Sequence, residues 1–307
     1  MENGDVNVIY SVQHQLPLIM YIGQYFFFTG LSAGSFVISV IATLLGRKEF
    51  KPIGKITAIL APALLIIAPL NLILDLEQPL RFWHLFLYYN WYSPITYGSF
   101  LLTAYPIMGI IYAVMVYTDR QKAAKIFGIL GIPLAISVHG YTGFILALAK
   151  ARSLWNTAAM PTIFLVSAMV SGIGLVIIIA AIRYKWFDKE ATPETREQDK
   201  RLIMQLAQFM AYTIMLDLFL IMSDILVLLT AHADAFQAGE LILVGNFAPL
   251  FVGVEIILGS FIPIFLILGP KVRNSLTAVV VASILVNIGV YAMRFVMVIG
   301  GQSIPLS

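Results

Sequence analysis

Eight long apolar runs constrain this 307-residue chain more than any other feature. A helix needs about 20 apolar residues to cross the ~30 Å hydrocarbon core of a bilayer. The runs are continuous, whereas the strands of a membrane β-barrel alternate apolar and polar residues. The sequence therefore predicts an all-α integral membrane protein with eight transmembrane helices. They cover residues 17–45, 55–75, 93–117, 124–149, 159–182, 203–231, 241–268 and 275–300.

The low charge content supports this class. Only 11% of the residues are charged, against about 25% in soluble globular domains. That composition excludes a soluble enzyme, a nucleic-acid-binding protein and a disordered chain. The sequence has no Cys, which excludes disulfides, thiolate-bound iron–sulfur clusters and Cys-bound zinc.

The basic residues predict the orientation. Most of them lie in the loops after the first, third, fifth and seventh runs. The positive-inside rule places these loops in the cytoplasm and both termini on the outer, periplasmic side. The first 16 residues contain Glu2 and Asp5 but no Lys or Arg. We therefore expect a translocated tail rather than a cleaved signal peptide.

The most polar segment, residues 188–201, suggests a cytoplasmic linker in the middle of the chain. Small residues recur at 29–34 in the first run and at 167–172 in the fifth. This recurrence favours two similar four-helix bundles, residues 1–158 and 159–307. The alternative is that the small residues only allow neighbouring helices to approach closely.

Polar groups inside a bilayer cost free energy, so each is a candidate functional residue. Tyr25 lies about 12 Å inside the first run, and His139 and Tyr141 lie about 23–26 Å along the fourth, near its outer end. Asp75 ends the second run on the same side. A quinone head group needs hydrogen-bonding partners and a group that passes protons. A Tyr, a His and a carboxylate at one interface provide that chemistry.

Each of these residues also has a structural alternative. Tyr25 fits an interfacial aromatic residue, His139 fits a core histidine bonded to a carbonyl, and Asp75 with Arg81 fits an ion pair. The aromatic residues between 83 and 92 fit an interfacial belt. All four His lie at or near the outer face, which leaves open a single outer haem between His139 and His232.

The second half contains ionisable residues deep in its runs. Asp217 and Glu255 lie near the membrane centre, Asp224 lies further out on the same face as Asp217, and Arg294 lies towards the outer side. These four residues indicate either a proton path or a structural cluster in which Arg294 neutralises an acid.

The chain resembles the polysulfide reductase membrane-subunit family, the NrfD/PsrC-like proteins, over essentially its whole length. Four motifs carry the resemblance, in the same order on the eight runs. They are Tyr25 with Gly30 to Gly34; Asp75 to His84 with Asn90, Ser93 and Pro94; Gly140 to Phe144 with Arg152 to Asn156; and Arg294-Phe295 with Gly301-Gln302.

The resemblance implies two four-helix bundles with a quinone site near the outer face of the first. It also implies a prokaryotic cell membrane location and no metal or haem bound by this chain. The implied partners are a periplasmic ferredoxin-like subunit with [4Fe–4S] clusters and a molybdopterin catalytic subunit that contains the terminal substrate site. Tyr141 matches a quinone-contacting Tyr of the family. Tyr25 replaces a His of a relative and Ile22 replaces an Asn, so we expect His139 or Gln24 to compensate.

We therefore expect menaquinone or menaquinol to bind between the first, second and fourth runs. Tyr25, Tyr141 and His139 would contact the head group, and Asp75 with Glu77 would handle protons. The remaining candidate binding residues are Gln24, Arg81 and His84. Loops 76–92 and 150–158 would form the docking surface. The alternatives are a passive membrane anchor and a secondary transporter.

Overall fold

The computed structural model describes residues 18–46, 51–76, 78–186, 192–270 and 275–303. These residues form helices and contain no strand, and eight of the helices are long and apolar enough to cross a membrane. The predicted membrane class and the eight spans are therefore confirmed. The spans are α1 (Met20–Leu45), α2 (Lys51–Asp75), α4 (Pro94–Tyr117), α5 (Gln121–Ala147), α6 (Met160–Trp186), α7 (Pro193–Thr230), η3 with α9 (Pro249–Phe261, Ile262–Leu268), and α10 with η4 and α11 (Leu276–Phe295, Val296–Gly300, Gly301–Ser303).

Two predicted boundaries are wrong. The expected linker 188–201 is helical from Pro193, because Pro at the first position and a Thr192 side chain that accepts from the Thr195 amide start α7 there. The expected run 241–268 is broken between α8 (Ala233–Leu243) and η3. Pro249 begins η3, since proline is tolerated in the first turn of a helix but disrupts its interior.

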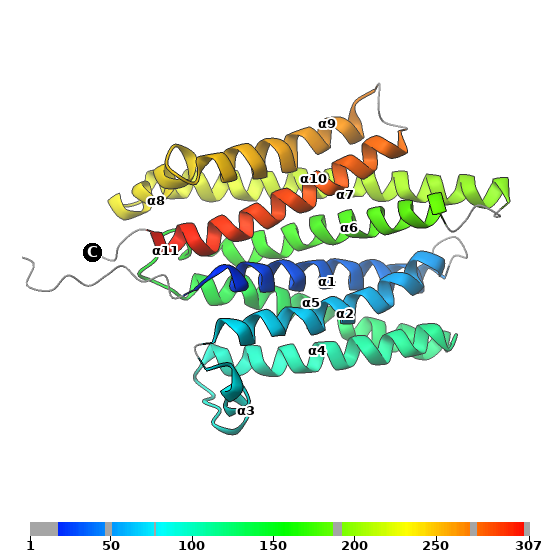
Figure 1. Cartoon of the computed structure of the whole chain (residues 1–307), viewed down its shortest axis with the longest axis horizontal. Helices are drawn as coiled ribbons and strands as arrows, with labels where there is room; N and C mark the ends of the chain where they lie inside the picture. Colours follow the sequence, from blue (N-terminus) through cyan, green and yellow to red (C-terminus); the bar gives the residue numbers. More distant parts are fainter. Residues whose placement is uncertain (1–17, 47–50, 77, 187–191, 271–274, 304–307) are drawn as a thin grey trace, which may run out of the picture.

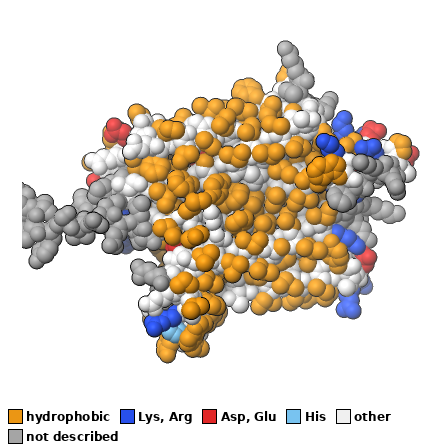
Figure 2. Space-filling model, viewed as in Figure 1, with side chains coloured by type: hydrophobic (Ala, Val, Ile, Leu, Met, Phe, Trp, Pro, Cys, Tyr) orange, Lys and Arg blue, Asp and Glu red, His pale blue; other side chains and the backbone are white. Residues whose placement is uncertain are grey.

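The long helices run roughly side by side, as Figure 1 shows. Helix α1 begins at one end of this bundle, where α3 (His84–Leu87), α8 and α11 also lie, and we call it the α3 end. We call the opposite end, where α4 leads into α5, the basic end. Apolar side chains cover the surface between the two ends, and Lys and Arg gather at the basic end (Figure 2). This distribution is typical of a protein whose middle faces lipid.

Helix α1 is central, since it packs against α2, α5, α6 and α10. The two small-residue patches meet at its crossing with α6. A Cβ atom placed on Gly34 would lie 2.7 Å from both the Gly172 Cα and the Ala168 carbonyl oxygen. The structure therefore shows the close helix approach that these small residues allow.

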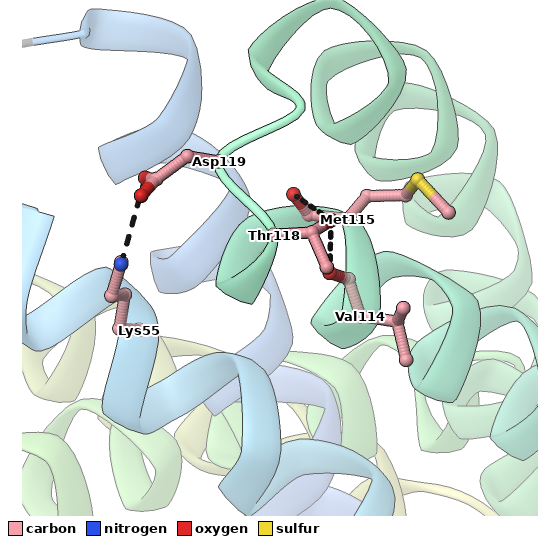
Figure 3. A network of polar contacts seen from close by, with 5 residues as sticks. All are labelled: Lys55, Val114, Met115, Thr118 and Asp119. Atoms are coloured by element: carbon pink, nitrogen blue, oxygen red, sulfur yellow. Dashed lines mark hydrogen bonds and ion pairs between the residues drawn. The ribbon is translucent and has the colours of Figure 1, made fainter.

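Among the described residues, hydrogen bonds and an ion pair join α1, α2 and α4. The Tyr112 hydroxyl lies 3.0 Å from the Ser39 hydroxyl and 2.8 Å from the Thr43 hydroxyl. At the basic end, Lys55 of α2 lies 3.5 Å from Asp119, in the turn that follows α4 (Figure 3). Asp119 has a positive φ of 53°, a conformation that Asp tolerates better than most residues.

Candidate functional site

Two tyrosines from different helices lie near the α3 end. Tyr25 of α1 is only 3% exposed, and its hydroxyl has no hydrogen-bond partner among the described residues. The half-buried Tyr141 of α5 lies within electrostatic range of this hydroxyl. The Tyr141 ring lies so close to Gly98 of α4 that a Cβ there would overlap it. Because burying an unpaired hydroxyl costs free energy, Tyr25 is suited to bonding a ligand.

His139 faces another side of α5. It precedes Tyr141 by two residues, which is about 200° around a helix. Its Nε2 lies 2.7 Å from the Phe164 carbonyl oxygen of α6, and its ring lies against Gly30 of α1. This contact is the one expected from the structural alternative, a core histidine bonded to a carbonyl. The Nδ1 atom has no partner among the described residues, so it is the one ring nitrogen left for another group.

The other candidates of the first half lie at or near the α3 end. An Asp75 carboxylate oxygen accepts a hydrogen bond from the Ile19 amide at 3.3 Å, which links the end of α2 to the start of α1. No ion pair joins Asp75 to the exposed Arg81 in the described part of the chain. The His84 ring contacts the Trp83 and Tyr88 rings.

Gln24 is half-buried beside Tyr25 in α1. Glu77 and His14 lie outside the described residues. Asn71, a residue that the sequence reasoning missed, is buried one turn before Asp75 on the same face of α2. A single amide side chain in an apolar run is the sequence feature that could have indicated it. Its side-chain nitrogen donates to the Ile67 carbonyl oxygen at 3.1 Å.

The loop between α5 and α6 is tied to the C-terminal end of the last span. The Trp155 indole donates to the Met297 carbonyl oxygen, and Arg152 donates to that of Gln302 at 3.2 Å. Gln302 accepts from the Leu18 amide at 2.9 Å and donates to the Leu18 carbonyl oxygen at 2.9 Å. The family motifs contained Arg152, Trp155 and Gln302. From the sequence, we placed Arg152 and Trp155 only in the docking loop 150–158 and gave Gln302 no role.

The second-half candidates divide into two places. Asp217, Glu255 and Arg294 are buried and interact electrostatically with one another. Asp224 has a different partner: its carboxylate accepts a hydrogen bond of 2.7 Å from the Thr157 hydroxyl. Asp217 and Asp224 share a helix face as expected, but the described contacts do not join all four residues.

The ring contacts of the two histidines do not favour the haem alternative. His232 Nε2 lies 3.3 Å from the Ser153 hydroxyl, whereas His139 bonds the Phe164 carbonyl. Within the described ranges, no group of three His, Cys, Asp or Glu residues is arranged to hold a metal ion.

Comparison with known proteins gives one family. A family model described as "Polysulphide reductase, NrfD" matches residues 11–305. The chain is 30% identical to the Hdr-like menaquinol oxidoreductase integral membrane subunit of Archaeoglobus fulgidus, over 91% of this chain and 69% of that protein. It is 29% identical to one of the polypeptides of the polysulfide reductase of Wolinella succinogenes, over 92% and 93%. It is 27% identical to a subunit of the selenate reductase of Mesobacillus selenatarsenatis, over 93% and 74%.

Proposed function

The chain belongs to the polysulphide reductase NrfD family, and from that premise we propose that it is the quinone-reactive membrane subunit of a respiratory reductase complex. Electrons pass between menaquinol or menaquinone and an iron–sulfur subunit bound to this chain. The names of the relatives support a menaquinol-linked reductase subunit. The buried, unpaired Tyr25 hydroxyl beside Tyr141 is the observation that supports the position of the site.

In the proposed site, the head group lies between α1, α2, α4 and α5 near the α3 end. Bound quinone supplies two-electron, two-proton chemistry. The Tyr25 and Tyr141 hydroxyls hydrogen-bond its oxygens and orient the ring. Asp75, at the end of α2, passes protons to the outer aqueous phase together with Glu77. His139 assists through Nδ1, and Gln24, Arg81 and His84 complete the candidate binding set.

The electrons leave through a partner in this proposal. The sequence contains no Cys and therefore no thiolate-held cluster. We place a ferredoxin-like [4Fe–4S] subunit on loops 76–92 and 150–158, with a molybdopterin subunit beyond it. Exposed aromatic and aliphatic side chains at the α3 end support this position, since exposed apolar patches mark interaction sites. They include Leu80, Trp83, Leu87, Tyr88, Trp91 and Tyr92.

We further propose that the α3 end faces the periplasm and that the spans form two four-helix bundles. Contacts of α1 with α2 and α5, and of α4 with the same two helices, support the first bundle. Contacts linking α6, α7, α9, η3 and α10 support the second. The excess of Lys and Arg at the basic end supports a cytoplasmic position for that end.

Single cysteines test this orientation, because the chain has no native Cys that would react. A membrane-impermeant maleimide added to intact cells is expected to label Asp234→Cys, in the exposed first turn of α8 at the α3 end and outside the docking loops. Lys122→Cys, in the first turn of α5 at the basic end, is expected to react only after the membrane is opened. The reverse pattern would overturn the proposed orientation.

A substitution at Gly98 tests the quinone site without changing either tyrosine. Gly98→Val is expected to displace the Tyr141 ring, because the added side chain occupies its position. Menaquinol-dependent turnover of the assembled complex should fall at least 10-fold, the range for a lost catalytic hydrogen bond. Gly140→Val is the matched control, since a Cβ there meets nothing within 4 Å. Equal turnover in both variants would contradict the site.

The two alternative functions, a passive anchor and a secondary transporter, differ from the proposed function in how a quinone-analogue inhibitor should act. Neither one requires quinone to bind between α1 and α5. A quinone-analogue inhibitor that blocks turnover of the wild-type complex but acts more weakly on Tyr25→Phe supports the quinone site. An inhibitor effect that is equal in the two proteins would favour the passive anchor.

A further inference from the structure

A small cavity lies in the second half of the chain, away from the two tyrosines. Its volume is about 10 Å³, close to the minimum that holds one water molecule. It is bounded by α6, α7, η3 and α10. The lining residues that matter here are Asp217, Glu255 and Ser260.

Both carboxyl groups at this cavity are buried without partners. Asp217 is 7% exposed and Glu255 is 4% exposed. The Asp217 Oδ1 atom and both Glu255 carboxylate oxygens have no hydrogen-bond partner among the described residues. An ionised carboxylate left unpaired in this position is costly, so such a group takes up a proton or pairs with a cation and water.

Arg294 supplies a buried positive charge within electrostatic range of both carboxyl groups. It is only 1% exposed, and its Nη2 donates to the Phe164 carbonyl oxygen at 3.0 Å and to the Ser167 hydroxyl at 2.6 Å. It interacts electrostatically with Asp217 and Glu255, but the described residues show no Arg294 ion pair within 4 Å. One guanidinium balances one of the two carboxylates. A neutral cluster therefore needs one added proton.

π-Helical segments lie at or next to this cluster. Glu255 lies inside the π-helix η3, and the π-helix η4 begins two residues after Arg294. The Ser260 hydroxyl donates to the Glu255 carbonyl oxygen, five residues earlier, at 3.1 Å. π-Helical turns are rare and occur frequently at functional sites.

We propose that Asp217 and Glu255 form a proton-holding site, which contains one exchangeable proton and one water molecule with Arg294 as the counter-ion. The Phe164 carbonyl oxygen links the site to the first half of the chain, because it bonds both Arg294 and His139. Asp224 is not part of it, since its carboxylate bonds Thr157. The inference goes beyond the quinone function and does not depend on it.

Infrared spectroscopy of the full chain in lipid tests this site at neutral pH. We expect a protonated-carboxyl C=O band that shifts in D2O. The band should also shift when the protein is made with ¹³C-carboxyl aspartate or glutamate. These measurements use the wild-type chain, so they do not depend on any variant folding. If no such band is found, or if the band does not respond to D2O, the proposal is overturned.

Variants assign the band to the cluster. Glu255→Gln and Asp217→Asn are each expected to remove or shift it, because each removes one of the two carboxyls that share the proton. Asp224→Asn is the matched control, since it removes a buried carboxyl that has a partner, and it should leave the band in place. Loss of the band in Asp224→Asn alone would overturn the assignment. An unchanged band in folded Glu255→Gln and Asp217→Asn would overturn it as well.

Discussion

Replacing Tyr141 with phenylalanine is expected to lower menaquinol-dependent turnover of the assembled complex by roughly 100-fold, as loss of one hydrogen-bond donor to a reacting oxygen does. The ring of Tyr141 lies against Gly98, and in the proposed site its hydroxyl and the buried Tyr25 hydroxyl bond the same head group. Phenylalanine keeps the packing of the ring and removes only the hydroxyl. The effect should therefore appear in turnover, with little change in thermal stability.

Tyr212→Phe is the matched control for this loss. Tyr212 lies on α7 in the other half of the chain and is 62% exposed on its surface. Its variant should turn over like the wild type. Tyr25→Phe should resemble Tyr141→Phe, because the two hydroxyls contact the same head group in the proposal. Wild-type turnover in both Tyr25→Phe and Tyr141→Phe would remove these residues from the site.

Gly172→Val should destabilise the chain by about 3 kcal/mol or more, at or above the upper end of typical overpacking costs. A Cβ on Gly172 would lie 2.8 Å from the Gly34 carbonyl carbon and 3.0 Å from the Ser35 amide nitrogen. Backbone atoms cannot move aside as the end of a flexible side chain does. The variant should therefore separate α1 from α6, and the thermal midpoint in detergent should fall.

Gly253→Val is the control for the glycine substitution. Gly253 also lies in a membrane helix, but a Cβ there meets nothing within 4 Å. Its thermal midpoint should stay close to that of the wild type. If Gly172→Val and Gly253→Val have equal midpoints, then α1 and α6 do not cross as closely as the structure shows.

Sequence alone predicted the class of this fold well, because lipid requires about 20 apolar residues in every span. It failed where local signals decide the boundaries. The charged segment 188–201 resembled a linker, but Thr192 and Pro193 start a helix that extends beyond the apolar run. The run 241–268 was continuous in hydropathy, although the helix is interrupted between Leu243 and Pro249.

The site was only partly predictable. Depth along a helix can be counted from the sequence, so Tyr25 and Tyr141 were correctly expected near one end. The direction in which a side chain points depends on how helices pack, which the sequence does not display. The sequence therefore left open whether His139 contacts the head group or bonds a carbonyl, and the structure shows its Nε2 atom 2.7 Å from the Phe164 carbonyl oxygen. The π-helix η3 changes the face on which Glu255 lies, and the hydrophobic pattern of the sequence did not indicate it.

Binding of a fluorescent menaquinone analogue to the purified complex tests the central claim most directly. The wild-type complex should bind the analogue at one saturable site. The Tyr25→Phe/Tyr141→Phe double variant should bind it 10- to 100-fold more weakly, as expected when about two hydrogen bonds of ~1 kcal/mol each are lost. Equal affinity in the two proteins, or the absence of saturable binding to the wild type, would contradict a quinone site between α1 and α5.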